Sequence, residues 1–268
     1  MSETDIGQGY KDYSPSPGTA WKGQTRTRIS EFVPSPHTTV NRRKKPPMPH
    51  DHPSHPATQR AEQTIEDVWE SKYAAAGPIW SGRVNKTLED VVSPLTPGKA
   101  LDLGCGEGGD TLWLASHGWQ ATGIDISPTA ILRGREQSKE LGLDPTSCTF
   151  IAEDLATWTP ETTYDLVTSS FLHSFDVEIP RTDILRRATE LVAKDGYFLL
   201  ITHAEPPSWA DADHHHHGLP SPDEDLAMLN LGERWEILVC ETREREGTGP
   251  QGQNGTLIDG VIFARRTD

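Results

Sequence analysis

The stretch that decides the fold runs from residue 98 to residue 127 and has the sequence GKALDLGCGEGGDTLWLASHGWQATGIDIS. It opens with a short apolar run, 100–103, which predicts a buried strand. A glycine cluster and a helical pattern follow, and the pattern stops at Gly118. A second apolar run, 119–124, ends on Asp125. The stretch therefore predicts a strand, a glycine-rich loop, a helix and a second strand with an acid at its tip.

This arrangement suits a cofactor that carries an adenosine group. Glycines let the backbone turn sharply and approach a ligand closely, and the N-terminus of the next helix favours negative charge. Asp125 follows the first glycine by about 20 residues, a position from which a carboxylate can accept both hydrogen bonds of a ribose diol. Gly104, Gly106 and Gly109 also satisfy the G-x-G-x-x-G fingerprint of dinucleotide sites. An NAD-dependent oxidoreductase is therefore one hypothesis.

Two acids favour a different cofactor. Asp102 stands two residues before the first glycine, and Glu107 lies inside the loop. Carboxylates at these positions would repel a pyrophosphate, but they suit a cofactor with cationic groups. The amino group and the sulfonium of S-adenosylmethionine are such groups. We therefore predict S-adenosylmethionine as the cofactor.

The same residues resemble those of a known family. The sequence Leu-Asp-Leu-Gly-Cys-Gly-Glu-Gly, residues 101–108, resembles motif I of the class I S-adenosylmethionine-dependent methyltransferases. Gly-Ile-Asp-Ile-Ser, residues 123–127, resembles their second-strand acidic motif, and the resemblance covers roughly residues 64–265. It implies a Rossmann-like α/β fold. In that fold, helices cover both faces of a seven-stranded, mostly parallel sheet with one antiparallel strand near the C-terminal edge.

Charge and cysteine content limit the partners. The chain has 268 residues and a formal net charge of −15, which disfavours a nucleic-acid substrate because phosphate binding depends on cationic surface. Its three cysteines have no metal or redox spacing and fit reduced thiols in a cytoplasmic protein. No apolar run is long enough for a membrane span, and none near Met1 resembles a secretory signal. We expect a monomer or homodimer.

Residues 1–60 differ from the rest of the chain. They hold nine of the 21 prolines and carry nine Lys and Arg against five acids. Such a segment buries too little apolar surface to offset its ordering entropy, so we predict a disordered tail. The basic run 42–45 either docks on an acidic surface or is solvated. Translation starting at Met48 is a further hypothesis. The predicted domain then spans residues 61–268.

An N-terminal lid is predicted over residues 61–95. Helical patterns cover 61–75 and 87–95, and a loop over 79–85 joins them. Trp-Glu-x-x-Tyr, 69–73, and Trp-Ser-Gly-Arg-x-Asn, 80–85, resemble the lid of thiopurine- and tellurite-type small-molecule methyltransferases. The resemblance implies that Tyr73, Trp80 and Arg83 line the site and that Arg83 pairs with the cofactor's carboxylate. The alternative is that the aromatic residues belong to the core.

The remaining pattern completes the sheet. Strands are predicted at 148–152, 164–169, 197–202, 235–242 and 257–265, helices at 128–140, 180–192 and 221–229, and a polar loop at 243–254. The resemblance implies that Asp154 binds the adenine amino group, with Leu155 near the ring and Glu153 as the rival acid. The predicted cofactor-binding residues are Trp80, Arg83, Asp102, Gly104, Gly106, Gly108, Asp125, Ile126, Asp154, Leu155 and Ser170.

Histidines supply the candidates for catalysis. His173 and His203 follow predicted parallel strands, at the end where α/β proteins place their chemistry. His214 begins a run of four histidines in the loop after the fifth strand. These imidazoles can take a proton from a hydroxyl acceptor, and the run could instead bind a metal or form an inert polar loop. We predict no metal. A thiolate acceptor would need no base.

These observations predict the transfer of a methyl group from S-adenosylmethionine to a small molecule through a sulfur, oxygen, nitrogen or metalloid nucleophile. Three alternatives stay open. They are the NAD-dependent oxidoreductase, a non-catalytic cofactor-binding protein, and a methyltransferase of macromolecules that uses the basic tail as a docking arm.

Overall fold

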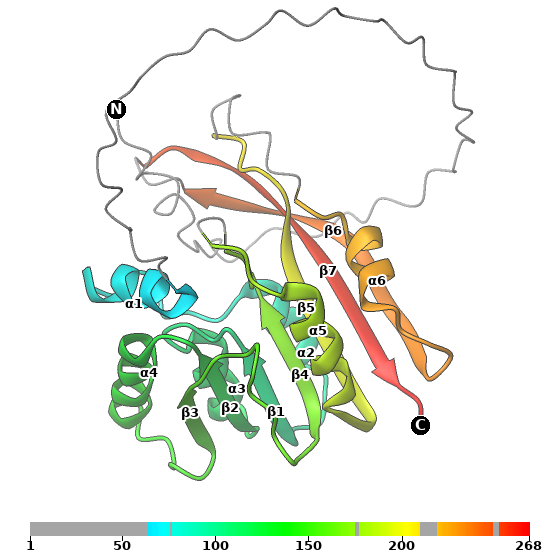
Figure 1. The fold of residues 1–268 in the computed structure, drawn as a ribbon, viewed down its shortest axis with the longest axis horizontal. Helices are drawn as coiled ribbons and strands as arrows, with labels where there is room; N and C mark the ends of the chain where they lie inside the picture. Colours follow the sequence, from blue (N-terminus) through cyan, green and yellow to red (C-terminus); the bar gives the residue numbers. More distant parts are fainter. Residues whose placement is uncertain (1–63, 76, 175–176, 210–218, 249–251) are drawn as a thin grey trace, which may run out of the picture. The chain divides into compact units, whose positions relative to one another are not determined.

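The computed structural model describes residues 64–75, 77–174, 177–209, 219–248 and 252–268 (Figure 1). The predictions for the tail 1–60 and for the histidine run at 214–217 lie outside the described residues. The helices are α1 (Ile65–Ala75), α2 (Lys86–Val92), α3 (Gly109–Ser116), α4 (Pro128–Glu140), α5 (Arg181–Glu190) and α6 (Pro222–Leu229). The strands are β1 (Lys99–Leu103), β2 (Gln120–Asp125), β3 (Cys148–Ala152), β4 (Tyr164–Ser170), β5 (Val192–Glu205), β6 (Trp235–Thr248) and β7 (Asn254–Arg266).

The strands form one sheet in the order β3-β2-β1-β4-β5-β7-β6. Neighbouring strands from β3 to β5 are parallel, whereas β7 is antiparallel to both β5 and β6. The order reverses at β1, because the chain moves outward to β2 and β3 and then returns to β4 on the other side. Ligands of open α/β sheets bind at such a switch point, beyond the carboxyl ends of the strands. The predicted sheet, with one reversed strand near the C-terminal edge, is confirmed.

Helices cover both faces of the sheet, as predicted (Figure 1). One buried cluster joins α2, α3 and α4 to the sheet, with Leu88, Leu112 and Ile131 at its helical side. The other cluster joins α5 and α6 to the opposite face through Leu185 and Leu229. Both β4 and β5 are buried along most of their length between the two layers.

Capping residues fix where two of the helices begin. Ser127 accepts a hydrogen bond from the Ala130 amide, and Pro128 occupies the first turn of α4. Ser221 and Glu224 form a reciprocal capping box at the start of α6. The carboxylate of Glu70 on α1 accepts hydrogen bonds from the Ser127 hydroxyl and from Thr129. The lid helix α1 is thus fastened to the start of α4.

The predicted polar loop at 243–254 is largely strand, so that prediction is wrong. β6 continues to Thr248 and β7 begins at Asn254, so only a short connection remains. The sequence Arg-Glu-Arg-Glu at 243–246 alternates between half-buried arginines and exposed glutamates. This period of two is the pattern of a strand with one covered face. Its charged composition conceals the strand because the buried side chains are themselves arginines.

Candidate active site

The glycine loop between β1 and α3 has a backbone that only glycine adopts readily. Gly106 has a φ of +54° and Gly108 a φ of +89°. A Cβ on Gly106 would lie 2.9 Å from the Tyr73 hydroxyl oxygen and 3.0 Å from Trp80 Nε1. A Cβ on Gly108 would lie 2.4 Å from the Phe150 ring. Gly106 therefore lets the lid approach the loop, whereas Gly108 lets the loop pack on the sheet.

Asp125, at the tip of β2, holds the loop in place. Its carboxylate accepts hydrogen bonds from the amides of Gly106 and Ser127, each at 2.9 Å. The residue is only 8% exposed, and burial raises its pKa to about 6. An acid at the end of the second strand, facing the glycine loop, is the arrangement that binds a ribose diol.

Asp102 is buried at the end of β1. Its carboxylate accepts hydrogen bonds from the hydroxyl of Thr111 on α3, at 2.7 Å, and from that of Thr168 on β4, at 3.2 Å. Burial raises the pKa of Asp102 to about 6, and the nearby charge of Asp125 acts in the same direction. Asp102 thereby joins three elements below the loop. Its direct contact with a cofactor stays a prediction.

Glu107, inside the loop, has partners from two other segments of the chain. Its carboxylate accepts hydrogen bonds from the amides of Ile79 and Trp80, each at 3.0 Å. It also pairs with the Arg133 guanidinium of α4 at 2.8 Å. The side chain is buried by these partners. Glu107 therefore fastens residues 79 and 80 to the glycine loop, and its effect on the choice of cofactor stays a prediction.

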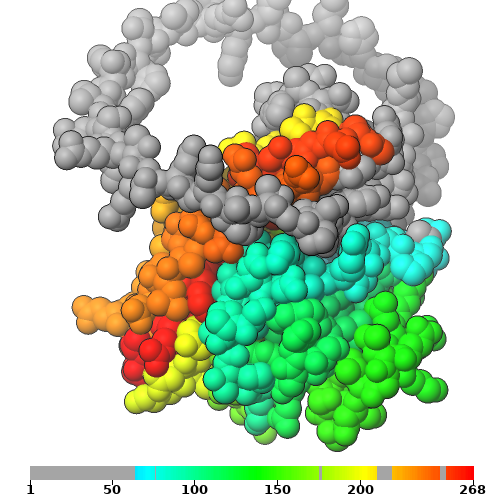
Figure 2. Space-filling model, turned by 180° about the vertical axis from the view of Figure 1, so that it is seen from behind, coloured from blue at the N-terminus to red at the C-terminus, as the bar shows by residue number. Residues whose placement is uncertain are grey.

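The lid places two aromatic residues on the loop. Trp80 Nε1 donates a hydrogen bond to the Tyr73 hydroxyl at 2.9 Å, and both groups lie beside Gly106. The lid and α3 form one continuous surface with α4 (Figure 2, cyan to green). Arg83 is exposed, and its pairing with the cofactor's carboxylate stays a prediction. The structure thus brings Trp80 to the loop, together with Tyr73.

The remaining predicted cofactor residues lie around the same edge of the sheet. Asp154 follows β3, and its carboxylate accepts a hydrogen bond from the amide of Ala156, which shapes the turn. The neighbouring Glu153 is exposed. The half-buried Leu155 packs against the cluster below α5, and the half-buried Ile126 follows Asp125. Their contacts with an adenine ring stay predictions.

Ser170 meets a residue that the sequence reasoning missed. Its hydroxyl donates a hydrogen bond to Asp110 at 2.8 Å, and the other oxygen of Asp110 accepts from the amide of Asn85 at 2.6 Å. Asp110 thus connects the end of β4, the start of α3 and the lid. The sequence offered one signal for Asp110, an acid in the first turn of a predicted helix. Acids are common at helix starts, so this signal does not single out a functional residue.

A second group of residues lies near the carboxyl ends of β4 and β5, where β7 and β6 pass beside them. His203 Nδ1 is 3.3 Å from Asp259 Oδ1, and Arg245 Nε donates to the other carboxylate oxygen at 2.6 Å. The ring of His203 stacks on that of Phe171 with centroids 4.2 Å apart. His173 stacks beside His203 at 5.8 Å. Burial lowers the pKa of His173 to about 3, assisted by His203 and Arg181, so its imidazole is neutral at pH 7.

Of the three predicted catalytic histidines, the structure brings His173 and His203 together, and His214 lies outside the described residues. The sequence reasoning missed Asp259 and Arg245. Asp259 lies in the strand predicted at 257–265, and Arg245 lies in the segment predicted as a loop at 243–254. In each case the sequence shows only a charged residue. Their meeting depends on the antiparallel register that pairs His203 with Asp259.

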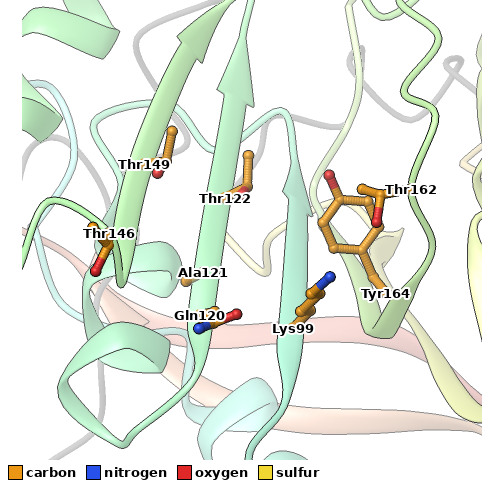
Figure 3. A pocket seen from close by; sticks show the side chains of 8 residues that line it. All are labelled: Lys99, Gln120, Ala121, Thr122, Thr146, Thr149, Thr162 and Tyr164. Atoms are coloured by element: carbon orange, nitrogen blue, oxygen red, sulfur yellow. The ribbon is translucent and has the colours of Figure 1, made fainter.

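A groove at the opposite edge of the sheet is a weaker candidate. It is lined by polar side chains near the amino ends of the strands, including Lys99, Thr122, Thr149 and Tyr164 (Figure 3). The groove lies away from the glycine loop, which follows the carboxyl end of β1. In the part of the chain that the structure describes, no cluster of three or more His, Cys, Asp or Glu side chains could hold a metal ion.

Comparison with known proteins agrees with this geometry. Residues 100–196 match the family model described as a methyltransferase domain. The chain is 32% identical over 133 residues to 2-heptyl-1-hydroxyquinolin-4(1H)-one methyltransferase of Mycobacteroides abscessus, which covers 44% of this chain and 56% of that protein. It is also 32% identical over 102 residues to probable thiol methyltransferase 2 of Arabidopsis thaliana, covering 37% and 45%. The chain thus spans about half the length of these relatives.

The fold is also that of a solved structure, from work on the conversion of a disulfide bond into a thioacetal group during echinomycin biosynthesis. The TM-score is 0.59 at 22% identity, over 76% of this chain and 92% of that one. Residues 100–196 thus match a methyltransferase domain, and the fold and the glycine loop resemble those of class I methyltransferases. Within this class, the relatives named above are by their names methyltransferases of small molecules.

Proposed function

We propose that this protein transfers a methyl group from S-adenosylmethionine to a small-molecule acceptor. The observation that carries the proposal is the closed arrangement of Asp125, the Gly106 amide, and the Tyr73–Trp80 pair. It places a carboxylate, backbone N–H groups and aromatic rings around one glycine loop. An uncharged or basic side chain in place of the buried Asp102 would have favoured a pyrophosphate instead.

The residues present fit this cofactor. Asp125 is placed to accept from the ribose hydroxyls once its bond to Gly106 is given up, and Asp154 stands at the next strand end for the adenine. The acids near the loop, Asp102 and Asp125, supply negative charge toward a cationic ligand. Arg83, exposed on the lid, is available for the cofactor's carboxylate. Bound there, the cofactor supplies an electrophilic methyl group on a sulfonium.

The protein's own contribution is to align the two reactants and to exclude water. Alignment alone can supply roughly 7–11 kcal/mol of the barrier reduction. The lid, which Glu107 fastens to the loop, covers the cofactor side. The ends of β4, β5 and β7 form the acceptor side, beyond the switch point of the sheet.

The names of the relatives support a small acceptor. One is a methyltransferase of a hydroxyquinolinone and the other of thiols, so both oxygen and sulfur nucleophiles occur among them. The absence of a nucleic-acid partner belongs to the same proposal and rests on the net charge of −15. A cytoplasmic location is proposed from the three cysteines, which form no disulfide. No helix of the described residues could cross a membrane.

Isothermal titration with S-adenosylhomocysteine and, separately, with NAD tests the proposal. We expect saturable binding of S-adenosylhomocysteine and none of NAD. Tight NAD binding without S-adenosylhomocysteine binding would establish the oxidoreductase alternative instead. A second experiment measures the formation of S-adenosylhomocysteine from S-adenosylmethionine in the presence of thiols, phenols, amines, halides or tellurite. Binding without turnover on the whole panel would favour the non-catalytic alternative.

A further inference from the structure

The acceptor side of the site contains a histidine–aspartate pair with a third charged partner. His203 on β5 and Asp259 on β7 are directly opposite each other in the antiparallel ladder. Asp259 is fully buried and His203 is 7% exposed. Arg245, from β6, bonds the second oxygen of Asp259 at 2.6 Å. Three neighbouring strands therefore each contribute one member.

This group lies next to the predicted methyl-donor loop. A Cβ on Gly104 would come within 2.9 Å of Leu172 Cδ1, so the turn after β4 touches the glycine loop. The residues on either side of Leu172 are Phe171 and His173, whose rings stack with His203. In the sheet, only β4 separates β1 from β5. The turn at residues 171–173 thus contacts both the glycine loop, through Leu172, and His203, through the rings of its neighbours.

The turn itself is strained. Phe171 has a φ of +56°, a conformation that is unfavourable for a bulky side chain. Its amide donates to the Ile201 carbonyl at 2.8 Å, and the Arg245 guanidinium lies over its ring at 5.5 Å. Such strain persists where the surroundings determine it, and it clusters at functional sites. Here it holds the Phe171 ring against His203.

The charges fix the chemical state of the histidine. Arg245 pairs with the buried carboxylate of Asp259 and compensates its charge. A carboxylate facing Nδ1 places the proton of the neutral imidazole on that nitrogen, and Nε2 then carries the lone pair. The 3.3 Å separation is long, as is common for catalytic hydrogen bonds before substrate binds.

We propose that His203, positioned by Asp259, is the general base of the reaction and that the acceptor is a weakly acidic hydroxyl of the phenol type. This inference rests on the proposed methyl transfer. The acceptor O–H bond breaks and its proton goes to Nε2 of His203. The oxygen forms the new C–O bond as the C–S bond breaks, with the electron pair left on sulfur. The proton then leaves His203 for solvent.

The acceptor class follows from what a base can change. A thiol of low pKa is ionised at neutral pH and gains little from a base, whereas a phenol is almost entirely protonated. A buried His–Asp pair beside the methyl donor should therefore accelerate methylation of a phenol much more than methylation of a thiol. General base catalysis contributes typically 10²–10⁴-fold.

The test compares phenol with thiophenol, which differ only in oxygen and sulfur, together with a panel of substituted phenols. His203→Gln removes the base but keeps a polar side chain, and His117→Gln, at the exposed end of α3, is the matched control. We expect His203→Gln to lower kcat on phenols by about 100-fold or more. Its kcat on thiophenol and its affinity for S-adenosylhomocysteine should stay within about threefold of the full chain's. His117→Gln should change none of these values.

Two further readouts do not depend on turnover of that variant. ¹⁵N NMR of the protein with S-adenosylhomocysteine should show His203 as the Nδ1–H tautomer. Asp259→Asn should move the rising limb of the kcat/KM profile to lower pH, because the imidazolium loses its carboxylate. The other charged or titratable groups near His203 are Arg245 and His173, with Arg181 beside the latter. Asp259→Asn combined with Arg245→Met removes both buried charges if the single variant does not fold.

Three results would overturn the inference: unchanged phenol turnover by His203→Gln, methylation by the full chain of thiophenol but of no phenol, or the Nε2–H tautomer. A full chain that fails to bind S-adenosylhomocysteine overturns the proposed function itself, so the two failures are distinguishable. A chain that binds S-adenosylhomocysteine but methylates no hydroxyl on the panel overturns this inference alone.

Discussion

Asp125 is the single residue on which we expect cofactor affinity to depend most. Asp125→Asn keeps the size of the side chain but removes its charge and one of its two acceptor oxygens. Hydrogen bonds to charged groups contribute about 1.5–3 kcal/mol, so we expect the affinity for S-adenosylhomocysteine to fall by about 10- to 100-fold. Isothermal titration measures it. Asp144→Asn changes an exposed aspartate outside the site and serves as the control. Equal affinities of both variants would contradict a ribose contact by Asp125.

Asp102 gives a prediction for the pH dependence of stability. Its pKa in the folded protein, about 6, lies above the ordinary value of 3.8. Its contribution to stability is therefore complete below about pH 4 and is lost as the pH rises through 6. Asp102→Asn cannot ionise. The free energy of unfolding of this variant, relative to the unchanged protein, should rise between pH 4 and pH 7 by up to about 3 kcal/mol.

Urea unfolding at each pH measures this difference. Asp144 supplies a control of opposite sign, because hydrogen bonds from Thr146 lower its pKa. Its contribution is present above the ordinary pKa and is lost as the pH falls. Asp144→Asn should therefore be relatively less stable at neutral pH than in acid. A pH-independent difference for Asp102→Asn would show that folding does not raise the pKa of Asp102.

Among the elements, the lid depends on Glu107 for its position over the glycine loop. Glu107→Gln leaves the amides of Ile79 and Trp80 with one weaker acceptor and breaks the pair with Arg133. Losing the partner of a buried group costs about 1–3 kcal/mol. We expect hydrogen exchange at these two amides to accelerate by about tenfold or more. Glu89→Gln, which loses only a surface pair with Lys86, should not change it. An unchanged exchange rate in Glu107→Gln would show that Glu107 does not hold residues 79 and 80 on the glycine loop.

The elements that sequence reasoning predicted well are those whose signals are local. The unit from β1 to β2 is one, because its apolar runs, glycines and acid follow each other within 30 residues. The partners of Glu107 at Ile79 and Trp80 were not predicted, because they lie in a segment that returns over the loop only in three dimensions. The prediction that Ser127 caps a helix is confirmed for the opposite reason, because the cap joins residues only three positions apart.

At the scale of the whole molecule, the half of the sheet that we propose for the acceptor side was the least predictable. β6 and β7 pair along 235–248 and 254–266, and their register decides that Arg245 reaches Asp259. The sequence contains each of these residues without any sign of their meeting, because a buried arginine and an exposed one look alike in a charged run. The proposed cofactor side is a local motif, whereas the proposed acceptor side depends on long-range strand pairing.

The boundary of the domain leads to the last prediction. All helices and strands of the described residues begin at or after Ile65, and residues 1–60 have a composition that does not favour a core. A chain starting at Ala61 should therefore unfold within about 2 °C of the full chain and should bind S-adenosylhomocysteine equally well. A chain starting at Gly77 is the matched control, because it also lacks Glu70 and Tyr73. Without them α4 loses its fastening and Trp80 its hydrogen-bond partner, so we expect a lower unfolding temperature and weaker binding. Scanning calorimetry with and without the ligand measures both. If loss of residues 1–60 alone abolished binding, those residues would belong to the site, and the predicted boundary at residue 61 would be wrong.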